Sequence, residues 1–365
     1  MSGRGGRAEG RGGALAGPVE EGSARAGTPA RTAPPGRTGR DPFFDNAKFL
    51  AIALVVSGHL IEDLRDVGIA HAAYFYVYVF HMPLFIVLSG YLSRNFTFSS
   101  GKARKLISAL AVPYAVFEVA YSLPRLVLYG KFEISLLDPY YLTWFLMSLF
   151  LWRLSTPVWQ QLRWPLVVAV GLSLLSGTSA LPDELSMNRT LGLLPFYVLG
   201  LMLRPEHLAL LRRRGARIAG AVTLAAGAAL ALVLHDDVKT EWIRWRHANE
   251  AIGVDDLTGS LIRLGMLAAG ALLVAAFLAV TPSRRTWYSG LGAATMYAYL
   301  LHGFVVKAAE HLYGDWAATP PGVAAVAASG VGLAALLCTP PVRRVTRWAV
   351  EPRMDWAFTR LRRPA

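Results

Sequence analysis

Long apolar stretches separated by short polar segments dominate the chain from about residue 44 onward. A helix needs about 20 predominantly apolar residues to cross a bilayer. Stretches near this length cover 44–62, 74–93, 106–128, 140–154, 164–181, 190–203, 216–234, 258–280, 290–310 and 322–339. The fourth and sixth are short for a full span, and tilting or a partly re-entrant path would accommodate them. The pattern predicts an all-α, polytopic membrane helix bundle with about ten transmembrane helices.

Basic residues in the connecting segments predict the orientation of these helices. Cytoplasmic loops collect Lys and Arg, and here every second connection is basic, namely 94–105, 153–163, 204–217 and 284–285. The long connection 235–257 mixes acidic residues with scattered bases. The distribution predicts a multi-pass protein of the cell (plasma) membrane with both termini in the cytoplasm.

The composition supports the membrane class. Hydrophobic residues make up 54% of the 365 residues and charged residues 17%, which does not fit an ordinary soluble surface. The net charge of +13 could indicate nucleic-acid binding, but the Lys and Arg lie between hydrophobic stretches rather than on one face of a soluble fold. We therefore expect the lipid bilayer, and no nucleic acid, as a partner.

The chain divides into three parts by composition. Residues 1–40 are rich in Gly, Ala, Arg and Pro and cannot bury enough apolar surface to fold, so they predict a disordered cytoplasmic tail. No apolar stretch precedes Phe43, which argues against a cleavable signal peptide. Residues 41–342 form the predicted transmembrane domain, and 343–365 form a basic cytoplasmic tail.

The sequence lacks several common catalytic and metal-binding motifs. The single cysteine, Cys338, excludes a disulfide framework and a thiolate metal cluster. The spans contain no phosphate-binding glycine loop, no GxSxG and no His-x-x-x-His pair. We predict no metal and no tightly bound cofactor. Any chemistry must then come from isolated polar residues inside the spans, where ionisable groups are costly and usually face a cavity.

The first two spans hold the most informative of these residues. Lys48 precedes His59 by eleven residues, which places both on one helical face about 16 Å apart. Lys48 could simply extend to the interface, and His59 could be a hydrogen-bonded core histidine. His81 near the middle of the second span favours a shared polar cavity instead. Glu62, one turn after His59, could orient its imidazole or could be an exposed loop residue.

Each of the further candidate site residues allows two interpretations. Asp45 could pair with Lys48 or only offset its charge at the interface. Glu118 lies seven residues before Arg125 on the same face, so it could face a cavity or form a structural ion pair.

Several segments in one order resemble the acyltransferase family 3 of multi-span membrane acyltransferases, especially its fucose O-acetylase-like branch. They are Lys48 with His59, the FHMPLF and LSGY segment from Phe80 to Tyr91, a Pro-Tyr in the third span, YLTWFLMSLF, LPFYVLGLML and TMYAYLLHG around His302. The resemblance runs from about Asp41 to His302. Two departures are Lys48, where many members have Arg, and a long interval from Lys105 to Pro113.

The resemblance implies transfer of an acyl group, usually acetyl, from cytoplasmic acetyl-CoA as co-substrate to a hydroxyl of a carbohydrate or related acceptor. His59 would be the general base, since imidazole titrates near neutral pH. Lys48 would hold the thioester arm of the donor. Basic residues of the first cytoplasmic loop would hold the CoA phosphates, although any cytoplasmic loop attracts such charges; these are Lys102, Arg104 and Lys105. The late segment implies a cavity or acceptor role for Tyr297 and His302. Trp144 of the YLTWFLMSLF segment could stack against a sugar or pack between helices.

Two functions of other classes compete with this prediction. In a transporter or flippase for a polar metabolite, the same buried residues would line a pathway; these are His59, His81, Glu118 and His302. The absence of a matched pair of broken helices weighs mildly against a transporter. A non-catalytic membrane scaffold is the third possibility.

Overall fold

The computed structural model describes residues 41–354 and 356–358, apart from 131, 133, 182, 183, 310 and 311. In this part of the chain every regular element is a helix and no strand occurs, which confirms the predicted all-α class. The predicted tail over 1–40 and the last residues of the basic tail lie outside the described residues.

The helices follow one another with short connections. In chain order they are α1 Pro42–Leu60, α2 Gly68–Ser93, α3 Ser100–Leu106, α4 Val112–Tyr129, α5 Trp144–Gln161, α6 Pro165–Leu175, α7 Met187–Gly192, α8 Leu194–Met202, α9 Pro205–Leu211, α10 Arg214–Leu234, α11 Thr240–Arg244, α12 Asn249–Ile252, α13 Asp256–Val280, α14 Thr295–Ala309, α15 Pro320–Leu337 and α16 Pro340–Val350. A π-helical turn, Ile107–Ala111, joins α3 to α4 just before Pro113. Short 3-10 turns occupy Glu62–Leu64, Glu184–Ser186 and Leu291–Ala294.

Six helices of the described chain are long and apolar enough to cross a membrane. They are Pro42–Leu60, Gly68–Ser93, Gly101–Val127, Arg214–Leu234, Asp256–Val280 and Pro320–Leu337. The other predicted spans overlap helices that are shorter or less apolar, namely α5, α6, α7 with α8, and α14. The chain is therefore a membrane protein, while the count of ten spans and the cytoplasmic location of the termini stay predictions.

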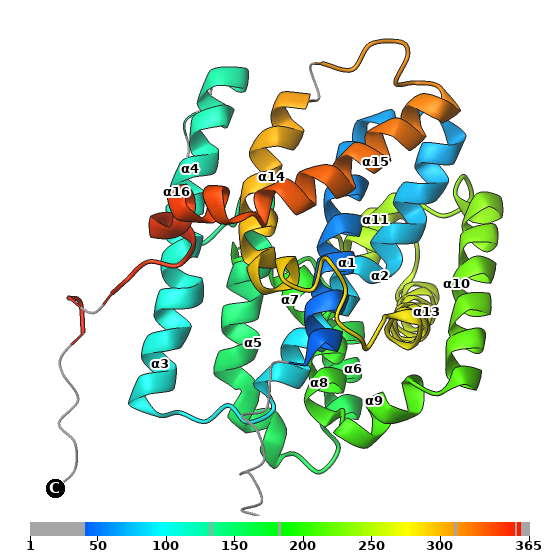
Figure 1. The fold of residues 1–365 in the computed structure, drawn as a ribbon. Coiled ribbons are helices and arrows are strands. Elements are labelled where there is room, and N and C mark those ends of the chain that lie inside the picture. Colours follow the sequence, from blue (N-terminus) through cyan, green and yellow to red (C-terminus); the bar gives the residue numbers. More distant parts are fainter. Residues whose placement is uncertain are drawn as a thin grey trace, which may run out of the picture. The chain divides into compact units, whose positions relative to one another are not determined.

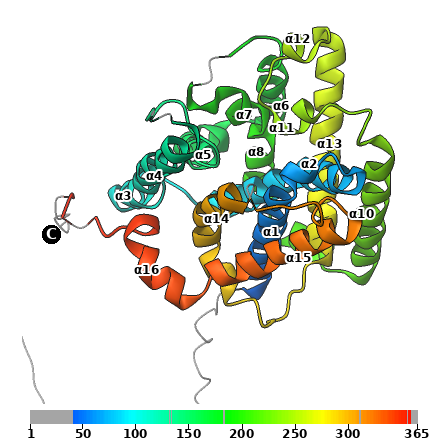
Figure 2. The same cartoon turned by 90° about the horizontal axis from the view of Figure 1, so that it is seen from above.

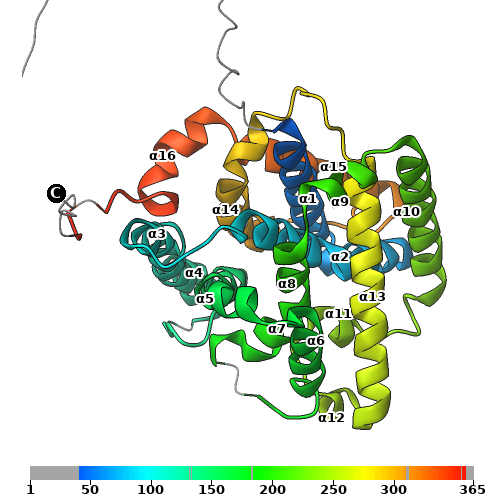
Figure 3. The ribbon, with the colours of Figure 1, turned by 90° about the horizontal axis from the view of Figure 1, so that it is seen from below.

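Helix α1 lies between the other helices of residues 41–358 (Figure 1). It packs against α2, α14 and α15, and α2 in turn contacts α8, α10 and α13. Views from above and below show α3, α4 and α5 on one side of α1 and α2, with α10 and α13 side by side on the other (Figures 2 and 3). Polar residues on α1 and α2 can thus be enclosed by elements from both sides.

The first half of α1 is fixed by a fully buried amide. Asn46 donates from Nδ2 to the carbonyl oxygens of Pro282, at 2.8 Å, and Arg284, at 2.9 Å. Its Oδ1 accepts from Ser289 Oγ at 2.6 Å and Thr286 Oγ1 at 3.0 Å. Because a buried amide is costly unless it is hydrogen-bonded, these contacts set the position of α1 against the segment that precedes α14.

Two glycines allow α2 and α8 to cross in direct backbone contact. A Cβ atom on Gly90 would overlap the carbonyl oxygen of Tyr197, and one on Gly200 would overlap the carbonyl oxygen of Val87. Small residues permit such close approach of membrane helices. The glycine of the LSGY segment therefore has a packing reason in this fold.

We predict that Gly200→Ala lowers the free energy of unfolding by about 1–3 kcal/mol, because the added methyl group must push two helices apart. Thermal unfolding of the purified protein in detergent measures this. The matched control is Gly171→Ala in α6, where nothing lies within 4 Å of the new Cβ, so it should leave stability unchanged or raise it by up to about 1 kcal/mol. Equal effects of the two substitutions on the free energy of unfolding would contradict the close contact of α2 and α8 at Gly200.

Candidate active site

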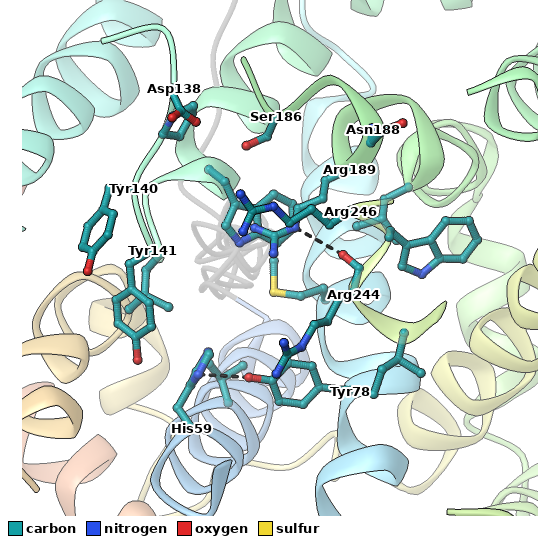
Figure 4. A pocket seen from close by; sticks show the side chains of 18 of the residues that line it. His59, Tyr78, Asp138, Tyr140, Tyr141, Ser186, Asn188, Arg189, Arg244 and Arg246 are labelled. Carbon is teal, nitrogen blue, oxygen red and sulfur yellow. Dashed lines mark hydrogen bonds between the residues drawn. The ribbon is translucent and has the colours of Figure 1, made fainter. Parts of the chain in front are cut away.

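A cavity of about 570 Å³ lies at the C-terminal end of α1. It is lined by His59, Glu62 and residues of α2, by the segment 134–144 before and at the start of α5, and by the segments 186–193 and 243–247. Figure 4 shows side chains from these segments pointing toward one another. Its walls therefore come from parts of the chain that are far apart in the sequence.

His59 sits in the last turn of α1 and is held by Glu62. Its Nδ1 lies 3.0 Å from the hydroxyl oxygen of Tyr78 (Figure 4). The same Nδ1 lies 3.2 Å from Glu62 Oε2, and the Tyr78 hydroxyl also lies 3.2 Å from Glu62 Oε2. A carboxylate only accepts hydrogen bonds, so this geometry favours the tautomer with hydrogen on Nδ1. No described residue hydrogen-bonds Nε2, which leaves its lone pair available in a residue that lines the cavity.

Glu62 is fixed from its other side by a cation. Its Oε1 accepts from Arg244 at 2.8 Å and from the Tyr74 hydroxyl at 3.2 Å, and Arg244 also donates to the Tyr74 oxygen at 3.0 Å. Burial raises the pKa of Glu62, but the hydrogen bond with His59 and the charges of His59, Arg244 and Arg65 outweigh it and lower that pKa to about 2. The carboxylate thus stays ionised beside His59 at any physiological pH.

Two further histidines lie close to His59. His81 lines the cavity and donates from Nδ1 to the Val77 carbonyl at 3.0 Å. The ring of His302 lies 5.4 Å from the His59 ring, and its Nδ1 is bonded to the Ala298 carbonyl at 2.8 Å. His302 is completely buried and is not part of the cavity wall, and no described residue bonds its Nε2. The structure therefore brings together the three histidines singled out in the sequence.

Glu118 fixes the loop that forms one wall of the cavity. Its carboxylate, which is 1% exposed, accepts from the Tyr140 backbone N–H at 3.0 Å and from Thr143 Oγ1 at 2.6 Å. Trp144 follows this loop, lines the cavity, and carries the guanidinium of Arg189 over its ring at 4.9 Å. Glu118 and Trp144 are thus both placed at the cavity, as a cavity role requires.

Basic side chains give the cavity wall a positive excess. The wall contains five basic side chains and three carboxylates. The bases are Arg125, Arg189, Arg244, Arg246 and Lys307, and the acids are Glu62, Glu118 and Asp138. Arg189 donates from Nε to the Arg244 carbonyl at 3.2 Å, and among the described residues no carboxylate lies within ion-pair distance of it. Burial and the neighbouring Arg246 lower the pKa of Arg189 to about 10. Such a wall can hold an anionic group.

The backbone around the cavity holds conformations that side chains disfavour. Four described non-glycine residues have positive φ, and three of them line the cavity: Tyr141 at 52°, Ser186 at 49° and Trp245 at 54°. The fourth, Leu185, adjoins Ser186. Strained backbone of this kind clusters at functional sites, which supports this cavity as the working part of the protein.

The predicted donor residues do not line the cavity. Lys48 lies eleven residues earlier on α1 and pairs with Asp45 at 2.9 Å. Neither belongs to the cavity wall, and the same is true of the loop residues Lys102, Arg104 and Lys105. The cavity lies at the end of α1 away from Lys48, so its walls do not reach the residue that would hold the thioester arm.

The late tyrosine and histidine segment needs one correction. Tyr297 is 1% exposed, lies near Arg343, and does not line the cavity. Tyr299 does line it, and its hydroxyl donates to the Leu142 carbonyl. Two positions along a helix differ by about 200° in direction, so a sequence match to the segment could not decide between the two tyrosines.

Several residues of the cavity escaped the sequence analysis. Tyr78 could have been found, because it lies with Tyr74 and His81 on the i, i+4, i+7 face of α2. Arg244 ends the short helix α11, 182 residues after Glu62, and no local pattern joins the two. The same holds for Arg189 and Arg246.

We predict that Glu62→Gln destabilises the protein at pH 7 by about 2 kcal/mol, because Arg244 loses its charged partner. The folded-state pKa of Glu62, about 2, lies below the ordinary value of 4.5. Its stabilisation is therefore full above pH 4.5 and declines as the pH falls toward 2, to about half at pH 3. Thermal unfolding at pH 7, 4 and 3 measures this, with exposed Glu250→Gln as control. A difference in stability between wild type and Glu62→Gln that does not shrink on acidification would contradict this prediction.

Comparison with known proteins agrees with the resemblance seen in the sequence. The family model described as "Acyltransferase domain" matches residues 41–339. A segment of 74 residues is 46% identical to the nodulation protein NolL of Mesorhizobium japonicum, and covers 19% of this chain and 20% of that protein. The chain thus spans about a fifth of the length of this curated relative. No solved structure matches. Because the family model covers most of the chain, the protein is a member of acyltransferase family 3.

Proposed function

We propose that this protein is an integral membrane O-acyltransferase that moves an acetyl group from acetyl-CoA to a hydroxyl of a carbohydrate or related acceptor. The observation that carries the proposal is the state of His59. Its Nδ1 is engaged by the ionised Glu62, while its Nε2 has no described partner and belongs to the wall of a large cavity. This is the arrangement of a general base oriented by a carboxylate.

Acyl transfer would use each part of this arrangement. His59 Nε2 takes the proton of the acceptor hydroxyl as the hydroxyl oxygen attacks the thioester carbonyl carbon. The C–S bond then breaks, and the imidazolium returns the proton to the departing CoA sulfur. Glu62, 3.2 Å from Nδ1, stabilises the imidazolium between these two events without itself taking a proton.

The cavity wall also suits a carbohydrate acceptor. Aromatic rings of Tyr140, Tyr141 and Trp144 line it together with hydroxyl, carboxylate and guanidinium groups. Aromatic faces pack against apolar sugar faces, while the polar groups bond to hydroxyls. The same wall in a transporter or flippase would bind a polar solute. Transport is therefore the alternative function, and the assay in liposomes distinguishes it from acyl transfer.

The donor would approach from the other end of α1. If the basic connections are cytoplasmic, as their charge predicts, the cavity lies at the extracytoplasmic end and the CoA phosphates stay near Lys102, Arg104 and Lys105. The thioester arm would then have to run beside Lys48 for about 16 Å along α1 to reach His59, a path that the walls of the main cavity do not include. The acyl group would thereby cross much of the bilayer before transfer.

We predict that His59→Ala lowers the rate of acetyl transfer about 10²- to 10⁴-fold, as expected for loss of a general base. Purified protein in liposomes is given acetyl-CoA labelled in the acetyl group together with an extract of cell-envelope glycans, and labelled acetyl ester is measured. The matched control is His207→Ala, which alters an exposed histidine on α9.

Two results would contradict this account. Wild-type rates in His59→Ala would remove the assignment of the base. A wild-type protein that neither binds nor consumes acetyl-CoA, while a polar solute crosses the liposome membrane, would replace acyl transfer with transport.

We predict that Arg189→Met raises the KM of one substrate about tenfold, the equivalent of about 1.4 kcal/mol of lost binding, with a smaller effect on kcat. The substrate affected identifies which one places an anionic group at this wall. Arg217→Met, an exposed arginine on α10, serves as the control. Unchanged KM values for both substrates would show that Arg189 only packs against Trp144.

A further inference from the structure

A second cluster of polar side chains lies outside the cavity, where α2 begins and α10 ends. His71 is in the first turn of α2, and His235 and Asp236 directly follow the last residue of α10. They line a separate pocket with Asp63, Asp66 and Glu241. The acyl-transfer account uses neither of these histidines.

The three side chains converge on one point. His71 Nδ1 lies 3.5 Å from Asp236 Oδ1, and His235 Nε2 lies 3.4 Å from the same oxygen. One ligand atom from each of the three residues lies within 4.8 Å of the other two. The centroids of the two imidazole rings lie 5.2 Å apart, and the rings are arranged edge to face.

The two separations between the histidine nitrogens and Asp236 Oδ1 match the spacing of ligands around a tetrahedral metal ion. Zinc binds His nitrogen and carboxylate oxygen at about 2.0–2.2 Å, which places neighbouring tetrahedral ligands about 3.3–3.6 Å apart. Two imidazole nitrogens and one carboxylate form a ligand set that zinc accepts, with water completing the shell.

The surroundings of the cluster favour a cation. The pocket is lined by five carboxylates and two bases; the acids are Glu62, Asp63, Asp66, Asp236 and Glu241, and the bases are Arg65 and Lys239. The Nε2 of His235 faces Asp236.

We propose that His71, His235 and Asp236 form a zinc-binding site that links the start of α2 to the end of α10. Glu62 lines both this pocket and the main cavity. A bound ion would therefore hold together two segments that neighbour the Glu62 and Arg244 contact. The proposal stands on these three residues and does not depend on the reaction carried out in the main cavity.

The test measures zinc binding by the full-length protein, purified in detergent without a polyhistidine tag and freed of metal by a chelator. Bound zinc is quantified by mass spectrometry after equilibrium dialysis against a series of free zinc concentrations, and the thermal midpoint is recorded in parallel. The variants are His71→Ala and Asp236→Asn. The matched controls are His207→Ala and Asp237→Asn, which alter an exposed histidine and the exposed acid next to Asp236.

The proposal expects one saturable zinc ion per chain and a zinc-dependent rise of the midpoint in the wild type and both controls. Each ligand variant should lose affinity by at least the roughly 10- to 100-fold that follows loss of a residue supporting a metal ligand. Asp236 is exposed, so its variant should fold even if His71→Ala does not. Absence of saturable binding, or equal binding by Asp236→Asn and Asp237→Asn, would overturn the proposal. A midpoint that responds to pH through His71 but not to zinc would identify a proton-binding pair instead.

Discussion

The ionised carboxylate of Glu62 is the constraint on which the rest of the site depends. A partly buried negative charge is costly unless hydrogen bonds and a cation compensate it. Here the compensation comes from three parts of the chain: His59 on α1, Tyr74 and Tyr78 on α2, and Arg244 at the end of α11. Satisfying one carboxylate therefore fixes α1, α2 and the distant short helix α11 at one end of the cavity, and it sets the tautomer of His59.

The remaining architecture holds that end of the bundle in place. The Asn46 amide anchors the beginning of α1, and the glycine crossing of α2 and α8 fixes the helix that carries Tyr78 and His81. The opposite wall depends on Glu118, which holds the loop before Trp144. The helices thus supply most of the polar side chains of the cavity, while strained backbone at Tyr141, Ser186 and Trp245 shapes other parts of its wall.

The sequence predicted the parts of this arrangement that local patterns control. Apolar stretches located the helices, and isolated ionisable residues within and just after them pointed to His59, Glu62, His81 and Glu118, all of which meet at the cavity. Periodicity gives only the face on which a residue lies, so it could not show that Lys48 is excluded from the cavity wall. Contacts such as Glu62 with Arg244 depend on how the short helix α11 packs against the ends of α1 and α2, and the spacing of residues along the chain does not indicate them.

The most direct test of the central claim is an experimental structure of the protein with a non-hydrolysable thioether analogue of acetyl-CoA. The account predicts that the carbon standing for the thioester carbonyl lies in the main cavity, about 3–4 Å from the position that an acceptor hydroxyl bonded to His59 Nε2 would occupy. An analogue bound with its acyl end outside the cavity, away from His59 and Glu62, would contradict the account.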